Sequence, residues 1–498
     1  MYEYISIVKQ NKLDYSNNPP FNPPEKYPEY PFESGLDSTN EAYTSVRETF
    51  HLLNLDIDNY GTSRWNPLGS LIKPGETVLI KPNLLRESHS LHPQEWKQII
   101  THGSIIRAVA DYALIALQGR GRLIIADGPQ YDSDFNSITL INGLNEIIDF
   151  YSKQNIQVEL LDLRRERWNQ KDGVIKERFK LPGDPVGYVH VDLGRNSEFS
   201  SYMLNAEFYG ADYDYQEVRD YHHNGRHEYI ICRTAIDADV VINLPKLKTH
   251  KKTGVTLSLK NFVGINGYRN CLPHHTVGTP KQGGDEFPNS TFSNKIQSEA
   301  IIQLKRFLVF HGNNGGFIAR FLFSLGRFLF GPTHKKIRSG NWYGNDTTWR
   351  MVLDLNKIFF HFNGDGNLRS RPIRYMTIID GIIAGEGNGP ENADARPVGL
   401  IIAGHNPVAA DTVCTTLMGL DYHKIPVISK AWSIKNYPLI DVAPYDIRCV
   451  SNINIFNGSL NDLRKSCQET FLMPIGWRNK TELENDLYNH AEDAILDS

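Results

Sequence analysis

The feature that most constrains the fold is an alternation of short apolar runs with segments of helical periodicity in the first third of the chain. The apolar runs lie at 77–80, 123–126 and 158–161, and the helical patterns between them lie at 105–117 and 142–153. This order predicts a β-α-β-α-β series, which forms a parallel sheet covered by helices on both faces. Ligands of such a sheet are expected at the carboxyl ends of its strands.

The same pattern returns in the second half of the chain. Apolar runs at 240–244, 376–380 and 399–404 predict further strands, and Pro407–Leu417 predicts a helix that begins after an Asn-Pro boundary. Ser104 is the expected cap of the helix at 105–117. The predicted fold class is therefore α/β, with a mainly parallel sheet, helices on both faces, large insertions and two lobes around a cleft.

Composition shifts divide the chain into five expected parts. They are an extended N-terminal arm (1–45), a first α/β lobe (46–163), an insertion (164–228), a second α/β lobe (229–455) with its own insertion (282–360), and a C-terminal tail (456–498). The two insertions are expected to supply lids or substrate walls. Residues 14–40 predict a surface arm, because they are rich in Pro, Asn, Ser and Tyr. The apolar and Arg-containing stretch within 317–343 predicts a packed helix or a lid, with an interfacial membrane helix as the alternative.

Composition limits the partners and the compartment. Among 498 residues, 53 Lys and Arg face 57 Asp and Glu, so the net charge of −4 gives no global attraction to nucleic acid. No stretch reaches about 18 apolar residues without a charge, and the N-terminus lacks the pattern of a signal peptide. The five cysteines show no C-x-x-C spacing, so no iron–sulfur cluster or zinc ribbon is expected. We therefore expect a cytoplasmic protein with reduced thiols and no membrane span.

The densest group of polar residues follows the run at 240–244. Lys246 and Lys248 occupy alternate positions, so both can point to one side of an extended segment, and a Gly-containing turn then carries His250, Thr253 and Thr256. Cations and hydroxyl donors at the end of a strand suit a carboxylate or a phosphate. His250 is a candidate metal ligand, acid/base or anion contact. On residue types alone, a solvated basic loop is an equal alternative.

Weaker signals come from other strand ends. His274 and His275 follow Pro273 and are candidates for a second ligand or proton donor, and Asn388 lies in a glycine-rich turn. Asp127 and Asp380 end predicted strands and are better site candidates than Asp411, whose position in the first turns of a helix favours a structural role.

Together these segments resemble the domain-of-unknown-function family 362, from about Val78 to about Leu420. The resemblance is carried by short matches in one order. They are Ile80-Lys81-Pro82-Asn83, Ala126-Asp127-Gly128-Pro129, Leu244 to His250, Thr256 to Asn261, Asp380-Gly381, Asn388-Gly389-Pro390 and Asn406 to Asp411. This resemblance implies a scaffold rather than a reaction.

A more distant likeness is to nickel-dependent lactate racemase, which holds a pincer nucleotide cofactor joined to a Lys, with a His ligand to the metal. The segment from His250 through Lys260 to His275 looks like that arrangement, although Ser258-Leu259 replaces the Gly-Gly pair of that family. The likeness implies that Lys260 anchors the cofactor and that His275, or His274, binds nickel. His250 then moves a proton, and Lys81 or Lys246 holds the substrate carboxylate. The same likeness places His102 in a polar loop.

Two functions follow as expectations. The first is an enzyme, of the isomerase or racemase type, that acts on a small anionic metabolite such as a 2-hydroxy acid or a sugar acid. The second is a non-catalytic protein that binds an anion or a metal within a larger assembly, such as one for surface-polysaccharide synthesis. The predicted catalytic residues are Lys81, Asp127, His250 and His275, and the predicted substrate-binding residues are Asn83, Lys246, Lys248, Thr253, Thr256 and Asn388.

Overall fold

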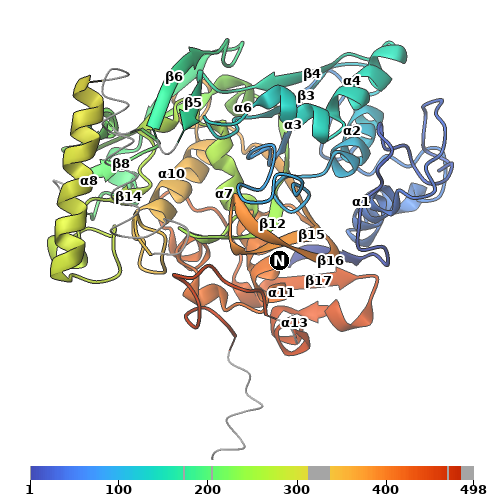
Figure 1. The fold of residues 1–498 in the computed structure, drawn as a ribbon. Coiled ribbons are helices and arrows are strands. Elements are labelled where there is room, and N and C mark those ends of the chain that lie inside the picture. The colour runs from blue at the N-terminus through green and yellow to red at the C-terminus, as the bar shows by residue number, and fades with distance from the viewer. Residues whose placement is uncertain are drawn as a thin grey trace, which may run out of the picture.

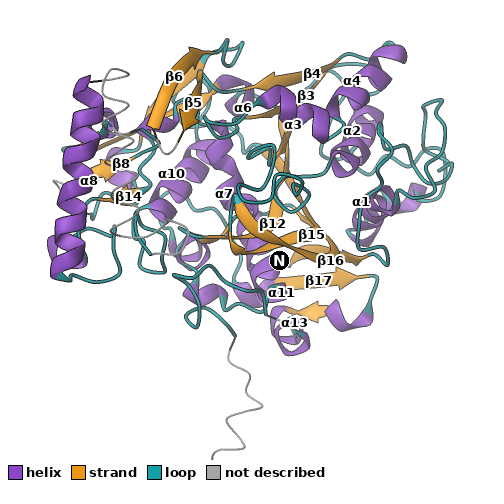
Figure 2. Cartoon of the chain, in the orientation of Figure 1, coloured by secondary structure: helices purple, strands orange, loops and turns teal. Residues whose placement is uncertain are grey.

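A sheet of eleven strands runs through the centre of the computed structural model, which describes residues 2–171, 174–202, 206–212, 214–311, 337–467 and 470–483 (Figures 1 and 2). Nine strands form its continuous path, in the order β18 (Gly458–Ser459), β17 (Ile447–Ser451), β1 (Glu3–Lys9), β16 (Asn392–Gly404), β15 (Arg374–Asn388), β11 (Val240–Leu244), β2 (Thr77–Pro82), β3 (Arg122–Asp127) and β4 (Val158–Asp162). Two short strands, β12 (Lys246–His250) and β13 (Gly254–Val255), pair beside β15.

The strand directions confirm the predicted α/β fold with a mainly parallel sheet. Strands β15, β11, β2, β3 and β4 are parallel neighbours, whereas β16 runs antiparallel to β15 and to β1. Strand β2 comes from the expected first lobe and β11 from the expected second lobe, and the two strands pair directly, from Val78 opposite Val240 to Pro82 opposite Leu244. One sheet therefore passes through both expected lobes.

Helices cover both faces of the sheet. They are α1 (Glu41–Leu52), α2 (Gly103–Leu117), α3 (Phe135–Ile141), α4 (Leu144–Lys153), α5 (Tyr215–Tyr221), α6 (Arg233–Ile236), α7 (Leu257–Asn261), α8 (Phe292–His311), α10 (Thr348–His361), α11 (Pro407–Leu417), α12 (Pro426–Ser429) and α13 (Leu460–Ser466). Helix α11 begins after the Asn-Pro boundary as predicted, with the Asn406 side chain accepting the N–H groups of Val408 and Ala409.

The strand residues alternate between two hydrophobic cores, as the two-residue period of a strand requires. On β2, Val78 and Ile80 pack in the core that contains α1, α2 and α4, whereas Leu79 packs in the core that contains α10 and α11. On β3, Ile124 faces the second core and Ile125 the first. Both faces of the sheet are thus buried, which explains why its strands read as continuous apolar runs.

The cap of α2 corrects one expectation. Its N-cap is His102 rather than Ser104, and the His102 Nδ1 atom accepts the N–H of Ser104. Burial lowers the pKa of His102 well below its usual value, with nearby Lys246 and Lys97 adding to the effect. The imidazole is therefore neutral and keeps a lone pair that can serve as the capping acceptor.

Side chains of the N-terminal arm are also more buried than expected. Residues 10–40 hold no helix or strand, but Tyr15, Phe21 and Tyr27 are buried, so the expectation of a surface arm is wrong for these side chains. The preceding strand β1 lies between β16 and β17 in the sheet.

The expected insertions contain two longer helices and contribute strands to three small sheets, two of which include residues of the expected second lobe. The sheets contain β5 (Glu166–Lys171) with β6 (Val174–Lys180), β7 (Tyr188–Asp192) with β10 (Arg226–Cys232) and β9 (His222–His223), and β8 (Phe208–Tyr209) with β14 (His275–Thr276). Helix α8 lies at the far end of the molecule from α1 (Figure 1). Helix α10 does not form a lid, because Met351, Leu355 and Ile358 are fully buried in the core. Most of the stretch 317–343 and the end of the tail lie outside the described residues.

No helix in the part of the chain that the structure describes is long and apolar enough to cross a bilayer. The structure has all five cysteines as free thiols.

Candidate functional site

A small pocket lies where the carboxyl ends of β2 and β3 meet β12 and α7. Its free volume is about 50 Å³, which is room for a few water molecules or one small anion. The pocket brings together six residues that the sequence predicted for the site, namely Asn83, Asp127, Lys248, His250, Thr256 and Lys260. Sequence reasoning missed Arg269, Leu85, Gly128, Val263, Gly264 and Pro390, which also line it.

The floor of the pocket is a buried ion pair between neighbouring parallel strands. Lys81 on β2 donates to Asp127 Oδ1 on β3 over 2.7 Å, and Asp127 also accepts the N–H groups of Leu84 and Gly128. Gly264 packs against this pair so closely that a Cβ there would lie 2.0 Å from Asp127 Oδ1. Lys81 is therefore committed to Asp127 and positions that carboxylate, which lines the pocket.

Three cations at the pocket have no carboxylate partner among the described residues. Lys248 Nζ donates to the carbonyl oxygen of Ile99 and, over 3.3 Å, to Asn83 Oδ1. Arg269 donates to the Gly128 carbonyl, and its Nε is buried without a partner. Lys260 Nζ makes no hydrogen bond or ion pair within the described chain. The pocket is thus an electropositive cavity with one carboxylate, which is already paired.

Burial weakens the protonation of the two lysines. Burial first, and then the nearby Lys246, lower the pKa of Lys248 to about 7. Burial first, and then Arg269, Lys252 and Lys81, lower the pKa of Lys260 to about 7. Each ammonium exchanges its proton near neutrality, because no anion stabilises the charged form.

His250 has a defined protonation pattern. Its Nδ1 accepts the backbone N–H of Lys252 over 3.0 Å and that of Thr253 over 3.2 Å. Burial, followed by the charge of Lys260, lowers its pKa well below the usual value, so the ring is neutral and its proton lies on Nε2. His250 therefore presents an N–H donor to the pocket. Thr256 adds a buried hydroxyl that has no hydrogen-bond partner in the described part of the chain.

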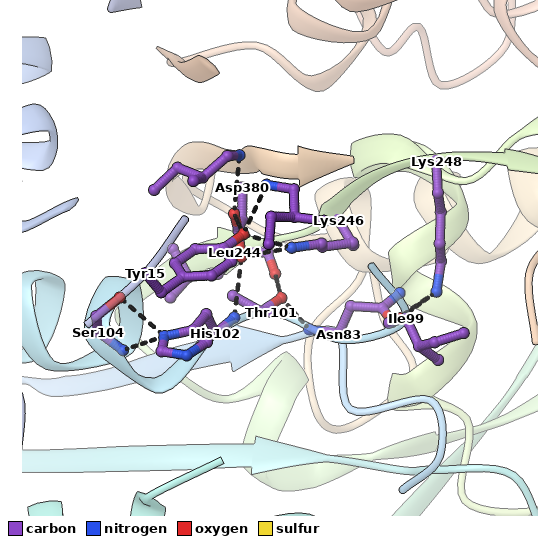
Figure 3. Close-up of polar contacts among 12 residues, drawn as sticks. Tyr15, Asn83, Ile99, Thr101, His102, Ser104, Leu244, Lys246, Lys248 and Asp380 are labelled. Atoms are coloured by element: carbon purple, nitrogen blue, oxygen red, sulfur yellow. Dashed lines mark hydrogen bonds and ion pairs between the residues drawn. The ribbon is translucent and has the colours of Figure 1, made fainter. Parts of the chain in front are cut away.

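Lys246, in contrast, belongs to a separate buried cluster (Figure 3). Its Nζ lies 3.0 Å from Asp380 Oδ2 and 2.7 Å from the Tyr15 hydroxyl, and the same Asp380 oxygen accepts the His102 N–H. The Tyr15 ring stacks on His102 at 4.0 Å between ring centres. Figure 3 shows Lys246 reaching this cluster while Lys248 reaches Asn83 and Ile99. Lys246 and Asp380 therefore neutralise each other, and neither lines the pocket, so a role for them in substrate binding stays a prediction.

The remaining predicted residues lie outside the pocket lining. Thr253 holds His250 through its backbone N–H, and Asn388 ends β15 and accepts the N–H of Ile475. His274 Nδ1 is bonded to the Leu272 carbonyl, and His275 packs against the Tyr209 ring. Burial lowers the pKa of both histidines, that of His274 to about 3.

The pincer cofactor expected from the distant likeness does not fit this arrangement. Lys260 offers an unpartnered amine, as an anchor requires. His274 and His275, however, do not line the pocket, and no three His, Cys, Asp or Glu side chains gather as metal ligands in the described ranges. A nucleotide-sized group also exceeds a volume of about 50 Å³.

Arg269 and Asp411 illustrate what the sequence signals did and did not reveal. Arg269 sits in a short 3₁₀ turn and belongs to no motif, so only the tertiary structure brings it to the pocket. Asp411, interpreted as structural, is buried on α11, and its carboxylate accepts the N–H groups of Ser258 and Leu259 at the start of α7.

Comparison with known proteins identifies the scaffold. Residues 184–416 match the domain of unknown function DUF362. The chain carries a DUF362 domain. The match begins after β2 and β3, so the DUF362 domain supplies Lys248, His250, Lys260 and Arg269 to the pocket, while Asn83 and Asp127 precede it.

The chain is also similar to a thylakoid-associated protein of Synechocystis sp. (strain ATCC 27184 / PCC 6803 / Kazusa). It is 23% identical over 362 residues, which cover 73% of this chain and 69% of the relative. The alignment is long enough to extend beyond the DUF362 domain. The cytoplasmic location expected from the sequence stays a prediction.

Proposed function

We propose that this chain is an enzyme that binds a small anionic metabolite, a 2-hydroxy acid or a sugar acid, in the pocket between β2, β3, β12 and α7. The observation that carries the proposal is the set of three cations, Lys248, Lys260 and Arg269, that face one cavity without a carboxylate partner. Buried cations are normally paired, because an isolated charge is costly in a low dielectric. A bound anion supplies the missing partner.

Each side chain has a role that follows from its donors. Lys248 and Arg269 hold the anionic group, because ammonium and guanidinium groups form strong charge-assisted hydrogen bonds to carboxylate and phosphate. His250 donates from Nε2, and Thr256 donates or accepts through its hydroxyl. Asp127 is the carboxylate available for proton transfer at the bound molecule, and Lys81 sets its position.

Binding is tested first with DL-lactate and sulfate by titration calorimetry on the full chain. We expect Lys248→Met and Arg269→Met to weaken binding about tenfold or more, since each removes a charged hydrogen bond. Lys295→Met, at an exposed lysine on α8, serves as the matched control and should bind like the unmodified protein. Failure of both anions to bind, or equal binding by all variants, would overturn the proposed anion site.

Catalysis is tested separately from binding. 2-Hydroxy acids are incubated with the protein in D₂O, and loss of the C2–H signal is followed by NMR. Exchange that disappears in Asp127→Asn supports the enzyme. Binding without exchange across a panel of 2-hydroxy acids and sugar acids would instead favour a non-catalytic anion-binding protein.

A further inference from the structure

Lys260 differs from the buried lysines near the pocket in its hydrogen bonding. Lys81 donates to Asp127, Lys246 to Asp380 and Tyr15, and Lys248 to two oxygens, whereas Lys260 Nζ donates to nothing in the described chain. An amine that is held in a polar cavity without a hydrogen-bond acceptor keeps its lone pair free for chemistry.

The surroundings of Lys260 favour the neutral amine. Its nearest charges are cations, with Arg269 and Lys252 acting after burial itself, and its pKa is lowered to about 7. A lysine that is desolvated and placed beside other cations is the arrangement that activates an amine as a nucleophile at neutral pH. Lys248 has a similarly lowered pKa, but its Nζ is occupied by the Ile99 carbonyl and Asn83.

The groups around Lys260 can bind two neighbouring groups of one substrate, a carboxylate and a second oxygen. Arg269 and Lys248 can hold a carboxylate, while His250 Nε2–H and the unpartnered Thr256 hydroxyl offer hydrogen bonds to a second oxygen. Thr256 is the N-cap residue of α7 and Lys260 lies in the same short helix, and both side chains line the pocket. A carboxylate with a carbonyl beside it, as in a 2-oxo acid, uses both sets of donors.

We propose that Lys260 forms an imine with the carbonyl carbon of a 2-oxo acid bound in this pocket. The inference rests on the proposed function, because it needs the anion site to hold the carboxylate. It narrows the metabolite to one that carries, or passes through, a carbonyl next to the carboxylate.

The step is balanced without any co-reactant. The Lys260 Nζ lone pair attacks the carbonyl carbon, the C=O π electrons move to oxygen, and a proton passes from nitrogen to oxygen to give a carbinolamine. Loss of the hydroxyl group with a second proton from nitrogen releases one water and leaves the C=N bond. His250 and Thr256 hydrogen-bond the oxygen as negative charge develops on it.

The experiment is borohydride trapping on the full chain. The protein is incubated with pyruvate, reduced with sodium borohydride, and examined by intact mass and peptide mapping. We expect a stable adduct on the peptide that contains Lys260, its loss in Lys260→Arg, and its retention in Lys295→Met. Trapping should slow as the pH falls from 8 to 6, because protonation removes the Lys260 lone pair.

Calorimetry with DL-lactate and sulfate on the same preparations separates the two proposals. Anion binding without an adduct, or an adduct that persists in Lys260→Arg, would overturn the imine and leave the anion site standing. Absence of anion binding would overturn the proposed function and the imine together. Measuring anion binding by Lys260→Arg also shows whether that variant keeps a folded pocket.

Discussion

At the scale of single residues, the site is defined by which buried charges are paired and which are not. Lys81 and Lys246 each reach a carboxylate within 3.0 Å, whereas Lys248, Lys260 and Arg269 at the pocket reach none among the described residues. A charge held away from water without a partner costs free energy, so the unpaired cations Lys248 and Lys260 lower the stability of the folded state. Unpaired charges of this kind with lowered pKa values are typical of binding sites, and we interpret these two lysines as part of one.

Anion binding should become stronger as the pH falls. Lys248 and Lys260 each have a pKa near 7, so both are largely neutral at pH 8.5 and largely charged at pH 6. An anion binds the charged form, and the affinity for lactate should therefore rise about tenfold or more between these values. Lactate keeps a constant charge over this range, so the change reports the protein. Calorimetry at pH 6 and 8.5 checks this, and Lys248→Met should reduce the slope. An affinity that is independent of pH would contradict the assignment.

The sequence alone could not distinguish the roles of the two lysines in β12, Lys246 and Lys248. Lys246 and Lys248 occupy equivalent alternate positions, yet Lys246 Nζ donates to Asp380 and Tyr15, whereas Lys248 Nζ donates to Ile99 and Asn83. Their roles differ because Asp380 and Tyr15, which are 134 and 231 residues away, meet only Lys246. Pairing over such separations leaves no local pattern, and Arg269 was missed for the same reason.

At the scale of elements, α7 places Lys260 and depends on α11. Helix α7 is only one turn long, and isolated helices of this length are unstable in water. Its first N–H groups are bound by Asp411, with Asp411 Oδ1 2.7 Å from Ser258 N and Asp411 Oδ2 2.9 Å from Leu259 N. Asp411 thus fixes the orientation of the turn that ends near Lys260.

Asp411→Ala should destabilise the protein by about 2–4 kcal/mol, because it leaves two buried N–H groups without an acceptor. Asp411→Asn should cost less, since its amide oxygen still accepts one of them. Urea unfolding measures the difference, and lactate binding by Asp411→Asn reports whether Lys260 has moved. Glu159→Ala, at an exposed ion pair with Arg122, is the control and should stay within about 0.5 kcal/mol. Equal stability of all three variants would show that α7 does not need this cap.

The elements that the sequence revealed are those with strong local patterns. The apolar runs of β2, β3, β4 and β11 and the helices α2 and α11 are visible because both faces of the sheet are buried. Strand β1 and helix α10 were not predicted. Strand β1 is held by pairing with residues about 400 positions away, and α10 is buried within a segment that was expected to be a surface insertion.

At the scale of the whole molecule, strand β1 joins segments that are far apart in the sequence. Strand β1 pairs antiparallel with β16 and parallel with β17, so the first ten residues hold residues 447–451 in place. Tyr15 then crosses to Asp380 and Lys246 and connects the N-terminal arm to the centre of the sheet. The pocket is assembled from strands on both sides of the β2–β11 contact, so the expected lobes are joined where the site lies.

A substitution in β1 should therefore loosen the whole sheet rather than one end of it. Ile7 is fully buried, and Ile7→Ala should cost about 2–5 kcal/mol by leaving a cavity. Hydrogen exchange should show weaker protection in β16 and β17 and also in β2, because these strands share one sheet. Tyr4→Ala, at a half-exposed position of the same strand, is the matched control and should leave protection nearly unchanged. Protection that falls in β16 and β17 but stays constant in β2 would mean that the two expected lobes unfold independently, despite the backbone pairing that joins them.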